Sequence, residues 1–245
     1  MQVTIDKKAI AKELQARINA IQGLGKMESG PAKTDLSPFT DAFPNRIFPM
    51  GTLHEFISYE PAHAASTSGF ITALAGKFMN ADSLCVWIGS ETKAFASGIK
   101  NFGIEPDRII FIHAPKHKDA LWIIEEVLKC EALTAVIAEI KELGFTESRR
   151  LQLAVERSGV TCFIHRYQPN NENAVACTTR WKILPLPSTT NDNLPGVGHS
   201  SWAVHLLKVR NGKPGSWHIN WLGGKFVSIA DQEFSITISN ERHTG

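Results

Sequence analysis

The sequence has few cysteines, and no two of them form a C-x-x-C pair. The 245 residues contain four, which are Cys85, Cys130, Cys162 and Cys177. The first three lie inside apolar segments, so we expect buried, reduced thiols rather than a zinc site or a disulfide framework. A metal site built on cysteine is therefore not predicted.

Long apolar runs are also lacking. No segment approaches the roughly 20 consecutive apolar residues that a membrane span requires. The first residues, MQVTIDKKAIAKELQ, have neither the apolar centre nor the cleavage site of a signal peptide. We therefore expect a cytoplasmic protein without a membrane segment.

The sequence also lacks a strong excess of one charge, because its formal net charge is only +2. The surplus lies in residues 145–245, which hold 11 Lys and Arg against 7 Asp and Glu. This balance is far below that of a dedicated nucleic-acid binder, so only weak, sequence-independent DNA contact is predicted. The candidate contacts are Lys208, Arg210 and Lys213, with Arg149 and Arg150 on a predicted helix. For these two arginines a solvated helix face is the alternative.

The N-terminal part is predicted to be a short amphipathic helix followed by a linker. Lys7–Gly23 has helical periodicity and ends at glycine, and residues 26–45 are rich in Pro, Ser and Asp without a period. Its apolar face consists of Ile10, Leu14, Ile18 and Ile21. We predict that this face docks on a partner or on another copy of the chain; packing on the chain's own sheet is the open alternative.

The central part alternates apolar strands with helical patterns, which is typical of an α/β core with a mostly parallel sheet. The predicted strands are Leu53–Ser58, Leu84–Gly89, Arg108–His113, Ala135–Ile140 and Val160–Arg166. The last helix of this part is predicted from about Thr146 to Ser158. The sequence thus divides into residues 1–45 (helix and linker), 46–189 (α/β core) and 190–245 (antiparallel extension and polar tail).

The extension is predicted from the segments WAVHLLKVR and SWHINWL, which alternate with period 2 and are joined by NGKPG. Tryptophans are frequent here, and such residues on alternating strands usually belong to the core, with base stacking as the alternative. They are Trp181, Trp202, Trp217 and Trp221.

The segment SYEPAHAASTSGF follows an apolar strand and precedes a helix, as a phosphate-binding loop does. Its small residues are Ser66, Thr67, Ser68 and Gly69. However, Phe70 follows the only glycine, and Lys77 lies two turns further along the predicted helix, too far to contact a phosphate at its N-terminus. We therefore predict a loop whose hydroxyl groups cap the helix, not a nucleotide site.

Several blocks together resemble the ImuA family of inducible-mutagenesis proteins, which are RecA-like proteins of bacterial translesion synthesis. These blocks are FPMGTLHEF, DALWIIEEVLKCEALTAVIAEI, LGFTESRRLQLAVERSGVTCFIHR, TRWKI and GKPGSWHINW. The resemblance extends from about Arg46 to Trp221. It implies a RecA-like three-layer core with a degenerate phosphate loop, and the N-terminal helix predicted above matches the family only in kind.

The resemblance also assigns two carboxylates. Glu91 falls where RecA-like ATPases have their general base, and Glu139 replaces the aspartate that holds the magnesium-bound water. For Glu139, a paired structural carboxylate and a functional remnant remain equally open. Two carboxylates without a phosphate-binding lysine do not make an ATPase, so no cofactor, metal or enzymatic activity is expected.

The function that the resemblance implies is that of a non-catalytic adaptor in SOS-induced, error-prone translesion synthesis. The implied partners are an ImuB-type polymerase-like protein and an error-prone polymerase, with RecA and a second copy of the chain as further candidates. Two alternatives remain. One is an ATP-dependent, DNA-binding RecA-like protein with an unconventional nucleotide site, and the other is a SulA-like cell-division inhibitor.

Overall fold

A nine-stranded sheet runs through the computed structural model, which describes residues 36–90, 96–189 and 198–229. Its strand order is β3-β2-β4-β5-β1-β6-β7-β8-β9. The strands are β1 (Leu53–Ser58), β2 (Cys85–Gly89), β3 (Ile109–His113), β4 (Ala135–Ile140), β5 (Thr161–Tyr167), β6 (Thr179–Thr189), β7 (His199–Val209), β8 (Gly215–Leu222) and β9 (Lys225–Ser228). β1 lies in the middle of this order, so it is the central strand.

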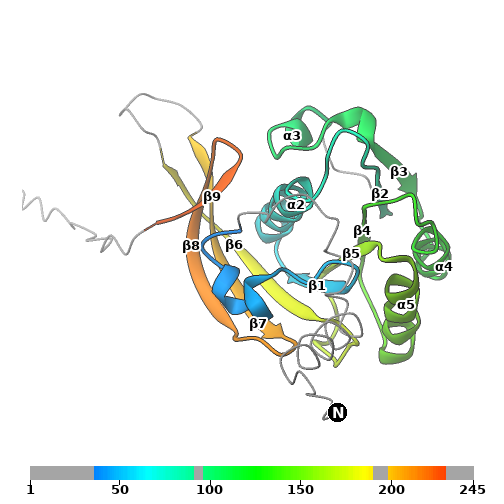
Figure 1. Ribbon diagram of the computed structural model, residues 1–245. Helices are drawn as coiled ribbons and strands as arrows, with labels where there is room; N and C mark the ends of the chain where they lie inside the picture. The colour runs from blue at the N-terminus through cyan, green and yellow to red at the C-terminus, as the bar shows by residue number, and fades with distance from the viewer. Residues whose placement is uncertain (1–35, 91–95, 190–197, 230–245) are drawn as a thin grey trace, which may run out of the picture.

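The strands from β3 to β6 are parallel to one another, and helices pack on both faces of this part of the sheet, although the edge strand β3 leaves Ile110 and Phe111 exposed. The helices are α2 (Pro61–Gly76), α3 (Ala96–Lys100), α4 (His117–Val127) and α5 (Phe145–Ser158). Figure 1 shows α2 on one side of the sheet and α4 and α5 on the other. Because most of β1, β2 and β4 is buried, these strands are mainly apolar, and their polar exceptions are His54, Glu55, Ser58 and Glu139. The predicted three-layer α/β core with a mostly parallel sheet is confirmed.

The antiparallel extension is also confirmed, since β7 pairs antiparallel with β6 and β8, and β8 with β9. β6 itself was not predicted, because Pro185 and Pro187 interrupt its alternating pattern. Both prolines are tolerated because β6 pairs with β1 only over its first three residues, Thr179–Trp181. Beyond Trp181, no β1 residue pairs with β6, so a proline there does not remove a hydrogen bond to β1. Figure 1 shows the long strands of this extension curving away from the helical part.

The end of the predicted linker belongs to the core. Two short 3-10 turns, Thr40–Ala42 and Pro44–Arg46, fold residues 36–46 against the sheet. Phe39 is fully buried, and its ring packs against Phe70, Trp181 and Phe226 at centroid distances of 6.0, 6.2 and 5.1 Å. The prediction of a linker or surface loop is therefore wrong for these residues, because Leu36, Phe39 and Phe43 supply apolar surface that the sheet buries.

The tryptophans of the extension lie in this aromatic cluster, as predicted. Trp181, Trp202 and Trp221 are buried, and Trp217 packs against the same cluster. The predicted helix Lys7–Gly23, with Ile10, Leu14, Ile18 and Ile21, lies outside the described residues.

The cysteines differ from expectation at one position. Cys85 and Cys162 are buried and reduced, whereas Cys130 is exposed because it follows Leu128, the last buried residue at the end of α4. Among the described residues, no group of His, Cys, Asp and Glu side chains could hold a metal ion. No helix in the same ranges has the length and apolar character needed to cross a membrane.

Candidate functional site

The connection between β1 and α2 is much shorter than a phosphate loop. It consists of Tyr59 and Glu60, and α2 begins at Pro61. Proline fits the first turn of a helix because its fixed φ is helical and its missing N–H would have no partner there. The predicted loop of Ser66–Gly69 is therefore wrong, since these residues lie well inside α2.

The hydroxyl groups of this segment do not cap the helix either. Thr67 Oγ1 donates to the carbonyl of His63 at 2.7 Å, one helical turn back, and Thr72 Oγ1 donates to Ser68 at 2.7 Å. Gly69 has a packing role, because a Cβ at this position would lie 3.2 Å from the Phe102 ring. Gly69 thus lets an aromatic side chain approach α2 closely, and the backbone of Ser66–Gly69 belongs to the interior of the helix.

Glu139 is paired with polar side chains at the carboxyl ends of the central strands. Ser68 Oγ donates to Glu139 Oε1 at 3.1 Å, and His165 Nδ1 lies 3.9 Å from the same oxygen. The other ring nitrogen of His165 is hydrogen-bonded to Ser58 Oγ at 2.7 Å. Both Ser58 and His165 are buried. This arrangement favours the structural alternative for Glu139.

The two-residue connection itself is covered by a second polar cluster. Tyr59 Oη donates to Glu172 at 2.8 Å, and Lys182 Nζ lies 2.7 Å from the same carboxylate oxygen. Burial by itself raises the pKa of Glu172, but the hydrogen bonds from Lys182 and Tyr59 outweigh this and lower it. Burial and the bond to Glu172 raise the pKa of Tyr59. The connection is therefore tied to the chain after β5 and to β6.

A buried ion network holds the loop between β5 and β6. Glu55 accepts a hydrogen bond from Arg166 Nη1 at 2.8 Å and another from Arg180 Nε. Arg166 Nη2 also donates to Asn171 O and Asn173 Oδ1, both at 2.9 Å. Sequence reasoning missed this network. The signal was present as one charged residue inside each of the apolar segments LHEFIS and TCFIHRY.

Three of the five DNA-contact candidates surround one pocket. Its lining comes from the N-terminal part of α5, the loop before β6 and the end of β7, and we call it the basic pocket. It is lined by Phe145, Arg149, Val175, Cys177, Lys208 and Arg210. Phe145 was not among the predicted site residues.

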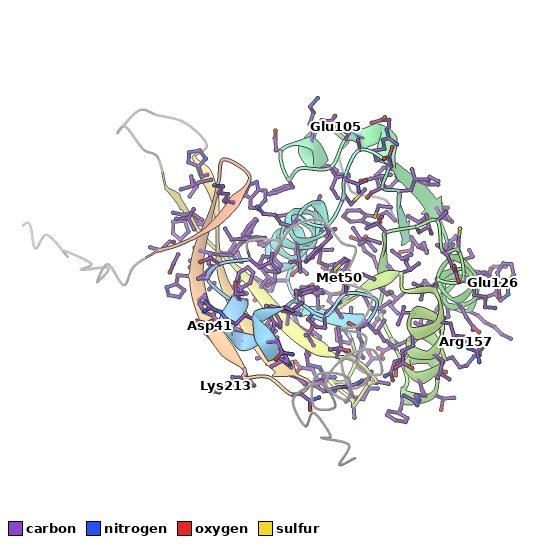
Figure 2. The ribbon with its side chains drawn as sticks, viewed as in Figure 1. Asp41, Met50, Glu105, Glu126, Arg157 and Lys213 are labelled. Carbon is purple, nitrogen blue, oxygen red and sulfur yellow. The ribbon has the colours of Figure 1, made fainter. Side chains whose placement is uncertain are left out.

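The other two candidates lie elsewhere. Arg150 forms an ion pair with Glu125 of α4 and lines a separate groove between α4 and α5. Lys213 lies in the turn between β7 and β8, where its backbone N–H donates to Ala42 O at 2.9 Å. In Figure 2, Lys213 is far from the labelled Arg157 at the end of α5. The five cations therefore do not form one continuous surface. Glu91 lies outside the described residues.

Comparison with known proteins identifies relatives of this chain. No protein-family model matches it. Protein ImuA of Caulobacter vibrioides, from strain NA1000 / CB15N and from strain ATCC 19089 / CIP 103742 / CB 15, is 30% identical over 187 residues. The match covers 71% of this chain and 77% of each relative. This chain therefore belongs to the ImuA family.

Proposed function

We propose that this protein is a non-catalytic adaptor in a DNA-damage-induced mutagenesis system. In this role it joins an ImuB-type polymerase-like protein to an error-prone polymerase during translesion synthesis, and it uses its RecA-like core as a scaffold. Membership of the ImuA family supports the link to mutagenesis. The site geometry supports a scaffold without nucleotide chemistry.

The two-residue connection between β1 and α2 is the observation that carries this proposal. A phosphate loop needs several backbone N–H groups that converge on the β-phosphate and a lysine that reaches the outer phosphates. Here Pro61 lacks an N–H, and Ser68 hydrogen-bonds to Glu139. An adaptor does not need the phosphate site, so its loss is compatible with the proposed role.

The partner contact that we propose outside the core is the apolar face of residues 7–23. Ile10, Leu14, Ile18 and Ile21 would pack against a partner or against another copy of the chain. Deletion of residues 1–23 should then leave the melting temperature nearly unchanged and abolish association. A truncated chain that is unfolded, or that associates as the full chain does, would contradict this part.

The proposal predicts that the protein does not bind ATP. The described connection between β1 and α2, Tyr59 and Glu60, offers neither a lysine nor converging N–H groups. ATP with magnesium should therefore not raise the melting temperature of the full chain, whereas a ligand of the native state raises it by mass action. A fluorescent ATP analogue should show no saturable binding. ATP hydrolysis that is lost in Glu91→Gln or Glu139→Gln would instead establish an ATP-dependent protein with an unconventional site.

The adaptor role is tested in cells of the source organism. A strain without the gene should lose mutagenesis induced by DNA damage, and the full chain supplied in trans should restore it. An affinity-tagged chain should bring down the ImuB-type protein after damage. Unchanged mutagenesis in the deletion strain would refute the proposal, and filamentation on overexpression would favour a cell-division inhibitor.

A further inference from the structure

The basic pocket carries positive charge that no carboxylate in residues 36–90, 96–189 and 198–229 neutralises by an ion pair. Arg149, Lys208 and Arg210 are all exposed, and none of them forms an ion pair with a carboxylate among the described residues. Arg149 donates to Gln152 Oε1 at 2.7 Å, and Lys208 donates to Val175 O at 3.4 Å. These neutral acceptors position the two cations but leave their charges uncompensated. An occupant of the pocket should therefore be anionic.

The floor and one rim of the same pocket are apolar. Val175 and Cys177 form the floor and are buried, whereas Phe145 on the rim is 60% exposed. An exposed aromatic ring beside an apolar floor is typical of a surface that anchors a hydrophobic side chain. The pocket thus combines a hydrophobic seat with a cationic border.

The loop that forms the floor is held in place from several directions. The N–H of Ala176 donates to Ser148 Oγ of α5 at 2.9 Å, and Asn173 Nδ2 donates to Leu143 O at 2.9 Å. The buried ion network adds bonds from Arg166 and Arg180 to the same loop. These hydrogen bonds already order the loop, so the pocket is preorganised. Binding to it therefore costs less conformational entropy than binding to a mobile loop.

We infer that the basic pocket is a docking site for an acidic peptide segment of a partner protein that carries a hydrophobic anchor residue. The anchor would pack on Val175, Cys177 and the Phe145 ring, and the flanking carboxylates would pair with Arg149, Lys208 and Arg210. This inference rests on the proposed adaptor function and names the part of the core that would serve it.

Charge and shape favour such a peptide over a nucleic acid. Three cations neutralise only a few phosphates, and salt-dependent binding by so few contacts is weak. The net charge of the whole chain, +2, adds little long-range attraction for a polyanion. A hydrophobic side chain, in contrast, gains free energy from the apolar floor in addition to the ion pairs.

The test is fluorescence anisotropy of the full chain with three labelled probes. The first is a short peptide with a Leu-Phe pair flanked by Asp and Glu, the second has the same charges with Ala-Ala in place of the pair, and the third is a single-stranded oligothymidine. The first peptide should bind, and the second should bind about tenfold more weakly or not at all. Arg149→Glu, Arg210→Glu and Phe145→Ala should each weaken binding of the first peptide by about tenfold or more.

The matched control variants change residues of α5 and of α4, the neighbouring helix. Arg157→Glu reverses an exposed charge at the far end of α5, where Figure 2 labels it, and Trp122→Ala removes an aromatic ring of α4 that is 63% exposed. Both should bind the first peptide as the unaltered chain does. Absence of peptide binding, equal binding of the two peptides, or equal loss in the controls would overturn the inference. Tighter binding of the oligothymidine that also depends on Phe145 would assign the pocket to nucleic acid instead.

Complementation separates the failure of this inference from the failure of the proposed function. In a strain that loses induced mutagenesis when the gene is deleted, Arg149→Glu combined with Arg210→Glu should fail to restore it, whereas Arg157→Glu should restore it. Full restoration by the pocket variant would overturn the role of the pocket and leave the adaptor function intact. If the deletion itself has no effect on mutagenesis, the proposed function fails.

Discussion

At the scale of single residues, the core of the sheet contains a neutral histidine. His54 lies in β1 between the rings of Phe48 and Phe163, at centroid distances of 4.5 and 5.4 Å. Its Nδ1 is hydrogen-bonded to Thr179 Oγ1 at 2.7 Å, and its Nε2 to Pro49 O at 3.0 Å. Burial lowers the pKa of His54 from 6.5 to about 3, although the bond to Pro49 opposes this. The native state therefore holds an uncharged imidazole.

The first prediction concerns the pH dependence that follows. The unfolded chain binds a proton on His54 near pH 6.5 and the native chain only near pH 3, so the stabilising effect is complete above pH 6.5 and falls as the pH decreases toward about 3. His54→Gln should be less stable at neutral pH by about 1–3 kcal/mol, because buried hydrogen bonds are lost. Its free energy of unfolding should also decrease less steeply with acid.

Urea unfolding across this pH range measures both effects. The exposed His218→Gln variant is the matched control, and its stability should follow that of the unaltered chain. If His54→Gln and the unaltered chain lose stability in parallel as the pH falls, the imidazole does not couple folding to protonation.

At the scale of elements, five of the six described parallel strands could be predicted because each is a short, mainly apolar run between helical patterns. β6 could not be, since its place is decided by pairing with β1 and β7, and its prolines argue locally against a strand. The start of α2 was missed for a related reason. Small polar residues such as Ser66 and Ser68 usually indicate a loop, but here Pro61 begins the helix and packing against β1 and β6 maintains it.

The site could be predicted only in part. Glu139 was correctly predicted to lie near the end of a strand, β4. Its partners Ser68, in α2, and His165, in β5, could not be predicted, because only the fold brings these elements together. Likewise, Arg149 lies in α5 and Lys208 in β7, which are far apart in the sequence. Their shared pocket depends on where the loop before β6 lies.

The second prediction tests the element that was taken for a linker. Phe39→Ala should lower the free energy of unfolding by about 3–5 kcal/mol, because its fully buried ring packs against side chains of α2, β6 and β9. Phe145→Ala, which removes the same ring from an exposed position, should change it by about 0.5 kcal/mol or less. Equal effects of the two substitutions in urea unfolding would show that residues 36–46 do not belong to the cooperative core.

At the scale of the whole molecule, the cations of the C-terminal half are dispersed over several surfaces. Lys208 and Arg210 border the basic pocket, whereas Lys213 lies in the β7–β8 turn. The third prediction is therefore weak, sequence-independent DNA binding that decreases steeply between low and moderate salt. Neutralising Lys208, Arg210 and Lys213 together should weaken it further, while Phe145→Ala should leave it unchanged. Electrophoretic mobility shifts at several salt concentrations measure this, and salt-independent affinity would contradict it.

The position of β1 in the sheet has a consequence for synthesis on the ribosome. β1 is the first of the described strands to be synthesised, but its neighbours are β5 and β6, so that Leu53 pairs with Cys162 and His54 with Thr179. Translation adds about 5–20 residues per second, so roughly 5–20 s pass between the synthesis of β1 and that of β5 and β6. During this time Glu55, in the middle of the strand, places a charge where nascent chains would otherwise associate. We therefore expect the carboxylate that later holds Arg166 and Arg180 to reduce aggregation of the unfinished chain.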